Sequence, residues 1–280
     1  MKITCRDRIL DLTSRTHIMG ILNVTPDSFS DGGRFLTEEA ALAQAETMIR
    51  AGADLIDIGG ESTRPYAEPV SQEEELSRVL PAIRAIRRRH QIPISIDTIK
   101  AEVARQALQA GADIINDISA LRLDPGMVEV ARTSRCPVII MHMQGTPSDM
   151  QVSPRYQDVV QESVDFFRER LQTLGQAGID PERIIIDPGI GFGKTLAHNL
   201  AILRHTADYQ ALGRPLLVGH SRKSFLKALL GAGPNDRDRP TAVLSALLAQ
   251  RRVEILRVHD VAATQEALSL AQALEGNRAQ

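Results

Sequence analysis

Short apolar runs recur along this chain, and the stretch between one run and the next is long enough for a helix. Each run is rich in Ile, Val and Leu, which is typical of strands buried on both faces of a parallel sheet. Eight such β–α units close into a (β/α)8 TIM barrel, so the pattern predicts this α/β fold. The runs cover residues 17–25, 55–60, 92–98, 114–119, 137–143, 184–189, 215–221 and 254–260.

Helix-length segments follow the strands, and Ser71 before Gln72-Glu73-Glu74 is one recognisable helix start. Residues 1–16 are expected to form a short hairpin on the barrel floor, within a single domain that spans 1–280. The predicted helices cover about 37–51, 72–90, 100–110, 124–134, 156–177, 195–210, 224–231, 239–251 and 261–275.

Composition narrows the class of protein. Apolar residues make up 43% of the 280 residues, enough for one substantial core, and the formal net charge of −2 argues against nucleic acid as a partner. Two cysteines are too few for a disulfide framework. The first ten residues lack a signal-peptide pattern, and no apolar run approaches the ~20 residues of a membrane span. We therefore expect a soluble, cytoplasmic protein without membrane partners.

Polar side chains stand at the ends of the predicted strands, where barrel enzymes carry their catalytic residues. Asp97, Asn116 and Asp187 end the third, fourth and sixth strands. Together they would suit a ligand rich in N–H donors, such as a 2-amino-4-oxo heterocycle. Helix capping is the alternative, because Asp97 lies just before a predicted helix.

Basic residues stand at the ends of the last two strands. The segment GHSRKSF (219–225) opens a helix, and the eighth strand ends in Arg257-Val258-His259, whose alternation points Arg257 and His259 to one side. Barrels often bind phosphate at this place. The alternative is a solvated basic turn with an ion pair at the strand end.

Generic motifs and metal clusters are absent from the sequence. GIGFGKT (189–195) resembles a phosphate-binding P-loop, but Pro188 occupies the position of its first glycine. The histidines form no zinc-like cluster, and the sequence leaves the roles of His142 and His220 undecided, with structural roles favoured. Asn23 beside a phosphorylated substrate would instead suit Mg²⁺.

These strand-end segments, taken together, closely resemble the bacterial dihydropteroate synthases. No single segment is decisive, but the set covers all the strand ends in the right order. The matching segments are ILNVTPDSFSDGG (21–33), GGESTRP (59–65), SIDT (95–98), IND (115–117), MHMQGTP (141–147), DPGIGFGKT (187–195), SRKSF (221–225) and RVHD (257–260).

The resemblance implies condensation of 6-hydroxymethyl-7,8-dihydropterin pyrophosphate with 4-aminobenzoate, with Mg²⁺ as cofactor. By resemblance, Asp97, Asp187, Lys223, Arg257 and His259 would be catalytic. The pterin would contact Asp97, Asn116, Asp187 and Lys223. Pyrophosphate would contact Asn23, Thr63, Arg64, Ser221, Arg257 and His259, and Asn23 would also hold the metal. The 4-aminobenzoate would contact Phe29, Thr63, Pro65, Phe192, Lys223 and Ser224.

The family resemblance also implies a homodimer through outer helices and competition by sulfonamides with 4-aminobenzoate. Tyr66 and His220 depart from the usual family residues and put sulfonamide affinity in question. Two other functions stay open at this point. One is a corrinoid-dependent methyltransferase acting on methyltetrahydrofolate, and the other is a pterin-binding paralogue without catalysis.

Overall fold

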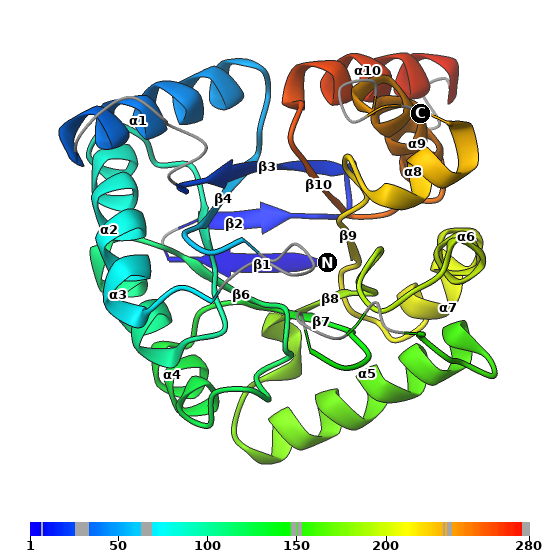
Figure 1. Cartoon of the computed structure of the whole chain (residues 1–280), viewed down its shortest axis with the longest axis horizontal. Coiled ribbons are helices and arrows are strands. Elements are labelled where there is room, and N and C mark those ends of the chain that lie inside the picture. Colours follow the sequence, from blue (N-terminus) through cyan, green and yellow to red (C-terminus); the bar gives the residue numbers. More distant parts are fainter. Residues whose placement is uncertain are drawn as a thin grey trace.

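The computed structural model of the chain is a closed parallel barrel with helices around it (Figure 1). It describes residues 1–6, 8–25, 34–62, 69–146, 150, 153–231, 233 and 237–275. No helix in these ranges is long and apolar enough to cross a membrane.

Eight parallel strands form the barrel, in the order β8-β7-β6-β5-β4-β3-β10-β9. The ring closes where Ile186 of β8 pairs with Leu216, the residue before β9. The predicted (β/α)8 fold is thus confirmed, with strands somewhat shorter than the apolar runs. The barrel strands are β3 (His17–Asn23), β4 (Leu55–Gly59), β5 (Ile94–Asp97), β6 (Ile114–Asp117), β7 (Val138–Met141), β8 (Ile184–Asp187), β9 (Leu217–Val218) and β10 (Ile255–Val258).

Helices surround the barrel, as Figure 1 shows from one end. One prediction was wrong: the expected helix 195–210 is two helices that meet at His205, whose backbone leaves the helical region with φ −110° and ψ 36°. The helices are α1 (Arg34–Arg50), α2 (Gln72–Arg89), α3 (Ala101–Ala110), α4 (Gly126–Ser134), α5 (Val159–Gln176), α6 (Leu196–Arg204), α7 (Thr206–Gln210), α8 (Ser224–Leu230), α9 (Asp238–Gln250) and α10 (Val261–Glu275).

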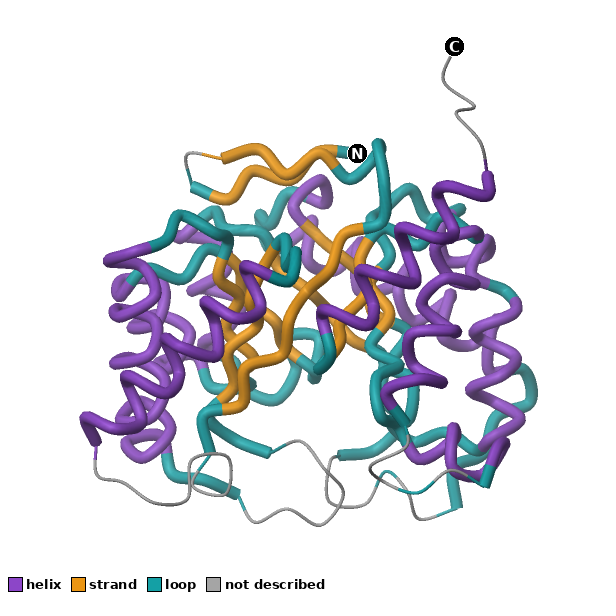
Figure 2. Tube along the Cα trace, turned by 90° about the horizontal axis from the view of Figure 1, so that it is seen from above, coloured by secondary structure: helices purple, strands orange, loops and turns teal. Residues whose placement is uncertain are grey.

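Strand alternation divides each barrel strand between two cores. Outward side chains pack under the helices, and inward side chains near the strand starts form a separate apolar cluster inside the barrel. An antiparallel hairpin of β1 (Lys2–Cys5) and β2 (Arg8–Asp11) covers this end of the barrel, and Figure 2 shows it there. The inner cluster contains Ile3, Cys5, Leu12, Met19, Leu55, Ile114, Ile139, Ile185, Leu217 and Ile255.

On four of the strands the next inward position is polar. Two residues after the apolar layer come Asp57 on β4, Asn116 on β6, Asp187 on β8 and Arg257 on β10. The barrel interior therefore changes from a sealed apolar floor to a charged mouth within one alternation of the strands.

Candidate functional site

Arg257 lies at the centre of the mouth and pairs with two carboxylates. Its Nε donates to Asp57 Oδ2 at 2.6 Å, and its Nη2 donates to Asp97 Oδ2 at 2.7 Å. The amide of Asn116 donates to both Asp57 oxygens, at 3.2 and 3.3 Å. Asp57 is fully buried, so its charge depends on these donors.

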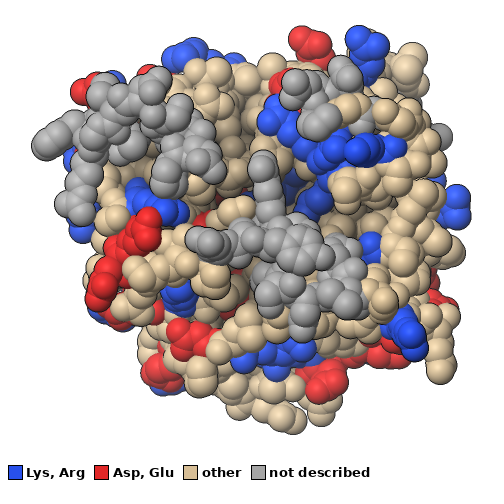
Figure 3. Space-filling view, viewed as in Figure 1, with Lys and Arg blue, Asp and Glu red and all other residues tan. Residues whose placement is uncertain are grey.

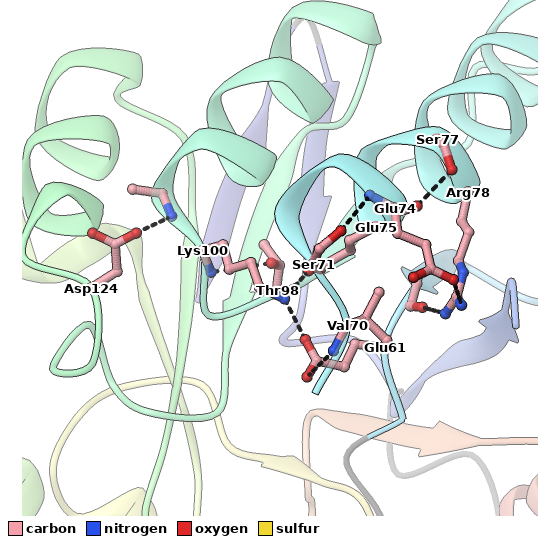
Figure 4. Close-up of polar contacts among 12 residues, drawn as sticks. Glu61, Val70, Ser71, Glu74, Glu75, Ser77, Arg78, Thr98, Lys100 and Asp124 are labelled. Atoms are coloured by element: carbon pink, nitrogen blue, oxygen red, sulfur yellow. Dashed lines mark hydrogen bonds and ion pairs between the residues drawn. The ribbon is translucent and has the colours of Figure 1, made fainter. Parts of the chain in front are cut away.

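Helix capping does not explain Asp97. The first backbone N–H of α3, on Ala101, donates instead to Asp124 Oδ2 at 2.7 Å (Figure 4). Asp97 is therefore available to Arg257 and to the space inside the mouth. This observation removes the capping alternative for that residue.

Burial shapes the charges of this site. It raises the pKa of Asp97 to about 7, even though Arg257 opposes the shift, and it raises the pKa of Asp187 despite the backbone N–H of Gly189 at 2.8 Å. Burial also lowers the pKa of Lys223 to about 8. Burial opposes the charge on Arg257 too, yet Asp57 and Asp97 raise its pKa. Carboxylates this poorly solvated favour ligands that bring N–H donors.

The opposite side of the mouth is basic. Lys and Arg side chains gather there beside α8 and α9 (Figure 3). Ser221 Oγ lies 2.9 Å from His259 Nδ1, and burial with the nearby Arg222 lowers the pKa of His259 to about 3. The alternative of a solvated basic turn fits Arg222, which forms an exposed pair with Asp238 at 2.6 and 2.8 Å. The expected ion pair at the strand end is that of Arg257 with Asp57 and Asp97, and it lies inside the barrel.

An aromatic ring borders this basic side. The Nζ of Lys223 lies 4.0 Å from the centre of the Phe192 ring, a cation–π contact. Phe192 is buried in a small apolar cluster with Ile118, Met141, Met143 and Met150. A flat apolar surface with an adjacent cation suits an aromatic carboxylate.

Comparisons with known proteins match almost the whole chain. The family described as "Pterin binding enzyme" matches residues 19–259. The dihydropteroate synthase of Escherichia coli K12 is 48% identical over 273 residues, which cover 98% of this chain and 96% of the relative.

Solved structures agree with this assignment. A Yersinia pestis dihydropteroate synthase with a sulfonamide drug is 46% identical, with a TM-score of 0.92 and coverage of 98% of this chain and 99% of that chain. A Xanthomonas albilineans dihydropteroate synthase with 4-aminobenzoic acid is 47% identical, with a TM-score of 0.92 and coverage of 98% of both chains. The chain belongs to the dihydropteroate synthase family. The predicted family and enzyme class are thus confirmed.

The structure brings most of the predicted site residues of this synthase-family chain to one mouth. They are Asn23, Asp97, Asn116, Asp187, Phe192, Ser221, Lys223, Ser224, Arg257 and His259. Phe29, Thr63, Arg64, Pro65 and Tyr66 lie outside the described residues, so the roles expected of them stay predictions.

The residues at both ends of the segment around Thr63 are described by the structure, and side-chain contacts hold them in place. Glu61 Oε1 accepts from the backbone N–H of Val70 at 3.3 Å, so one carboxylate ties both ends together (Figure 4). Lys100 Nζ bridges Glu61 and the buried Glu75, each at 2.5 Å. The chain therefore enters and leaves this segment at a fixed place beside the turn after Asp97.

The sequence reading missed Asp57, which lies inside a strand rather than at its end. The strand LIDIG is otherwise apolar or glycine, and its inward positions are 55, 57 and 59. A carboxylate at an inward position of a buried strand is itself a reason to expect a polar partner. That pattern could have identified Asp57.

His220 and His142, whose roles the sequence left undecided, have structural surroundings. His220 is fully buried, with Nε2 at 2.9 Å from Ser245 Oγ on α9. His142 packs its ring against Phe166 and Tyr156, with ring centres 5.0 and 6.0 Å away. The departure at position 220 thus contacts α9.

Asp57→Asn should lower kcat/KM for dihydropteroate formation by about tenfold or more, because Arg257 loses a charged partner and can turn away from Asp97. Steady-state kinetics of the folded variant measure this. Asp54→Asn is the control, since Asp54 pairs with Arg15 near the barrel floor, at 2.8 Å. An unchanged kcat/KM in Asp57→Asn would contradict this role.

His220→Gln should reduce the acid sensitivity of folding. Burial lowers the pKa of His220 to about 4 in the folded protein, below the ordinary 6.5, so the unfolded chain binds the proton first and stability falls as pH drops below 6.5. Between pH 7.5 and 5, the wild type should lose about 1–2 kcal/mol more than the variant in urea unfolding. Equal losses would show that His220 is not buried neutral.

Proposed function

We propose that this chain condenses 6-hydroxymethyl-7,8-dihydropterin pyrophosphate with 4-aminobenzoate to give 7,8-dihydropteroate and pyrophosphate. The observation that carries the proposal is the division of one barrel mouth into an acidic half and a basic half. Asp97, Asn116 and Asp187 offer acceptors on one side, and Ser221, His259 and Arg257 offer donors on the other. A substrate with an N–H-rich ring at one end and two phosphates at the other complements both halves.

The pterin binds at the acidic half. Its ring N–H groups donate to Asp97 and Asp187, two carboxylates whose pKa values are raised by burial and which gain from added donors. Asn116 supplies an amide from the neighbouring strand, and Lys223 reaches the ring from the other side. This arrangement recognises the heterocycle by its hydrogen-bonding edge.

Pyrophosphate binds at the basic half, against Arg257, His259 and Ser221. In this proposal Thr63 and Arg64 add contacts from their segment. The neutral His259 donates one N–H, and Arg257 carries the charge that the departing anion needs. The 4-aminobenzoate lies against Phe192 and Lys223, with Phe29, Thr63, Pro65 and Ser224 around it. Sulfonamides compete for this place.

Asn23 is suited to be the single protein ligand of a Mg²⁺ ion. Its side chain makes no hydrogen bond to another described residue, and it lies at the mouth beside Gly59, whose missing side chain leaves space between Asn23 Oδ1 and Asp97 Oδ2. No cluster of three acidic, His or Cys ligands exists among the described residues, which suits an ion held largely by water and phosphate. When bound, Mg²⁺ would neutralise charge on the pyrophosphate.

The reaction needs no protein nucleophile. The C–O bond to pyrophosphate breaks, and the electron-rich dihydropterin spreads the positive charge that develops on its exocyclic methylene. Asp97 and Asp187 stabilise that charge, while Arg257 and His259 stabilise the leaving group. The amine nitrogen then forms the new C–N bond and loses a proton. Closure of the mouth around the substrates excludes water, which competes with the amine.

Purified protein given the pterin substrate, Mg²⁺ and 4-aminobenzoate should release pyrophosphate and dihydropteroate in equal amounts. Without 4-aminobenzoate, dihydropteroate should not form. Chromatography and a coupled pyrophosphate assay measure the two products. Pterin binding without turnover would instead support the non-catalytic alternative, and an absence of pterin binding would refute the site.

We further propose that the chain is a homodimer through α8 and α9. Leu229, Leu230, Val243 and Leu247 are each 45–58% exposed there and border an apolar groove shared with α6. Apolar surface of this kind usually marks a protein interface. Cys5 and Cys136 are free, buried thiols, which supports a reducing, cytoplasmic location.

Light scattering should give twice the chain mass of 30.7 kDa for the wild type. Leu247→Glu should shift the mass to that of one chain, because a charge would enter the apolar interface. Leu123→Glu is the matched control, since Leu123 is 47% exposed on another part of the surface. A dimer that persists in Leu247→Glu would exclude this face.

A further inference from the structure

Lys194 is a buried ammonium group that the reaction does not use. It is 4% exposed, and burial lowers its pKa to about 7. Its Nζ donates to two backbone carbonyls, those of Phe192 at 2.9 Å and His142 at 3.1 Å. No carboxylate of the described chain lies within salt-bridge distance of it. A buried charge with only neutral acceptors is costly, so its position requires a reason.

The two carbonyls belong to different strand exits. His142 follows β7, and Phe192 stands in the segment that follows β8. This segment lies directly on the β7 exit: a side chain at Gly189 would come within 2.1 Å of the His142 carbonyl, and one at Gly193 within 2.8 Å of the Gln144 carbonyl. Both glycines have positive φ, so the segment needs glycine for its shape as well as for its close approach.

Asn199 on α6 holds the other side of the same segment. Its Oδ1 accepts from the backbone N–H of Gly191 at 2.7 Å, and its Nδ2 donates to the Thr195 carbonyl at 2.8 Å. The segment is thus fixed from two directions, by Lys194 toward β7 and by Asn199 toward α6. Phe192 is the side chain that this segment presents to Lys223 at the mouth.

We propose that Lys194 is a positioning residue that fixes the Phe192 ring against the 4-aminobenzoate without touching either substrate. The inference rests on the proposed function, which places 4-aminobenzoate against Phe192 and Lys223. Lys194 acts through its hydrogen bond to the Phe192 carbonyl, which belongs to the same residue as the ring that it positions. Asp97, Asn116 and Arg257 stand on other strands, and Asp187, at the end of β8, accepts from the Gly189 N–H at 2.8 Å and not from Lys194.

Lys194→Met keeps the length of the side chain and removes its donors. The KM for 4-aminobenzoate should rise about tenfold, and the inhibition constant of a sulfonamide should rise by a similar factor. The kcat and the KM for the pterin substrate should stay within about twofold, because a ring contact equal in ground and transition states affects KM alone. Lys227→Met, at an exposed position on α8, should leave all of these constants unchanged.

Asn199→Ala provides an independent test, because it releases the same segment from the opposite side and should give the same selective rise in KM. Lys194→Gln, which keeps an uncharged N–H donor group, should fold if Lys194→Met does not and should show a smaller rise. A KM for 4-aminobenzoate within twofold of the wild type in both Lys194→Gln and Asn199→Ala would overturn the proposal, as would equal rises in both KM values. A wild type without turnover would refute the proposed function instead.

Discussion

The ion pairs of Arg257 with Asp57 and Asp97 hold the rest of this site in place. Three charged side chains from three strands meet inside the barrel, at bond distances of 2.6 and 2.7 Å. Charges buried to this extent are stable only when they are paired and hydrogen-bonded. The pairs therefore fix the position of the guanidinium inside the mouth.

The same pairs explain why the carboxylates can recognise a ligand. One guanidinium serves two carboxylates, and the backbone supplies Asp187 with a single described N–H. The mouth thus keeps acceptors that its own donors do not satisfy, and burial raises the pKa values of Asp97 and Asp187. A heterocycle rich in N–H groups supplies the hydrogen-bond donors that these carboxylates lack. The apolar cluster at the barrel floor prevents water from entering the mouth through the barrel.

Much of this arrangement follows from local sequence. Eight buried runs with helix-length segments between them predict the barrel, and the strand ends place Asp97, Asn116 and Asp187 at its mouth. Asp57 lies inside its strand rather than at the end, so this rule does not identify it, whereas the period-two alternation of the strand does. The family resemblance assigns the segment around Thr63 and Tyr66 to the site. The contacts of these two residues lie outside the described part of the chain.

Long-range contacts could not be predicted. The role of Lys194 depends on a hydrogen bond to the carbonyl of His142, 52 residues earlier in the chain. The sequence of the segment 189–195 excludes a P-loop but does not indicate this partner of its lysine. Sequence spacing reports which face a side chain takes, and tertiary packing decides which group it meets.

The most direct test is a crystal structure of the protein with Mg²⁺ and a non-cleavable analogue of the pterin pyrophosphate. The account predicts the pterin ring within hydrogen-bond distance of Asp97, Asn116 and Asp187, with the phosphates on Arg257, His259 and Ser221. A pterin bound away from these carboxylates, or phosphates that leave Arg257 and His259 without contact, would contradict it.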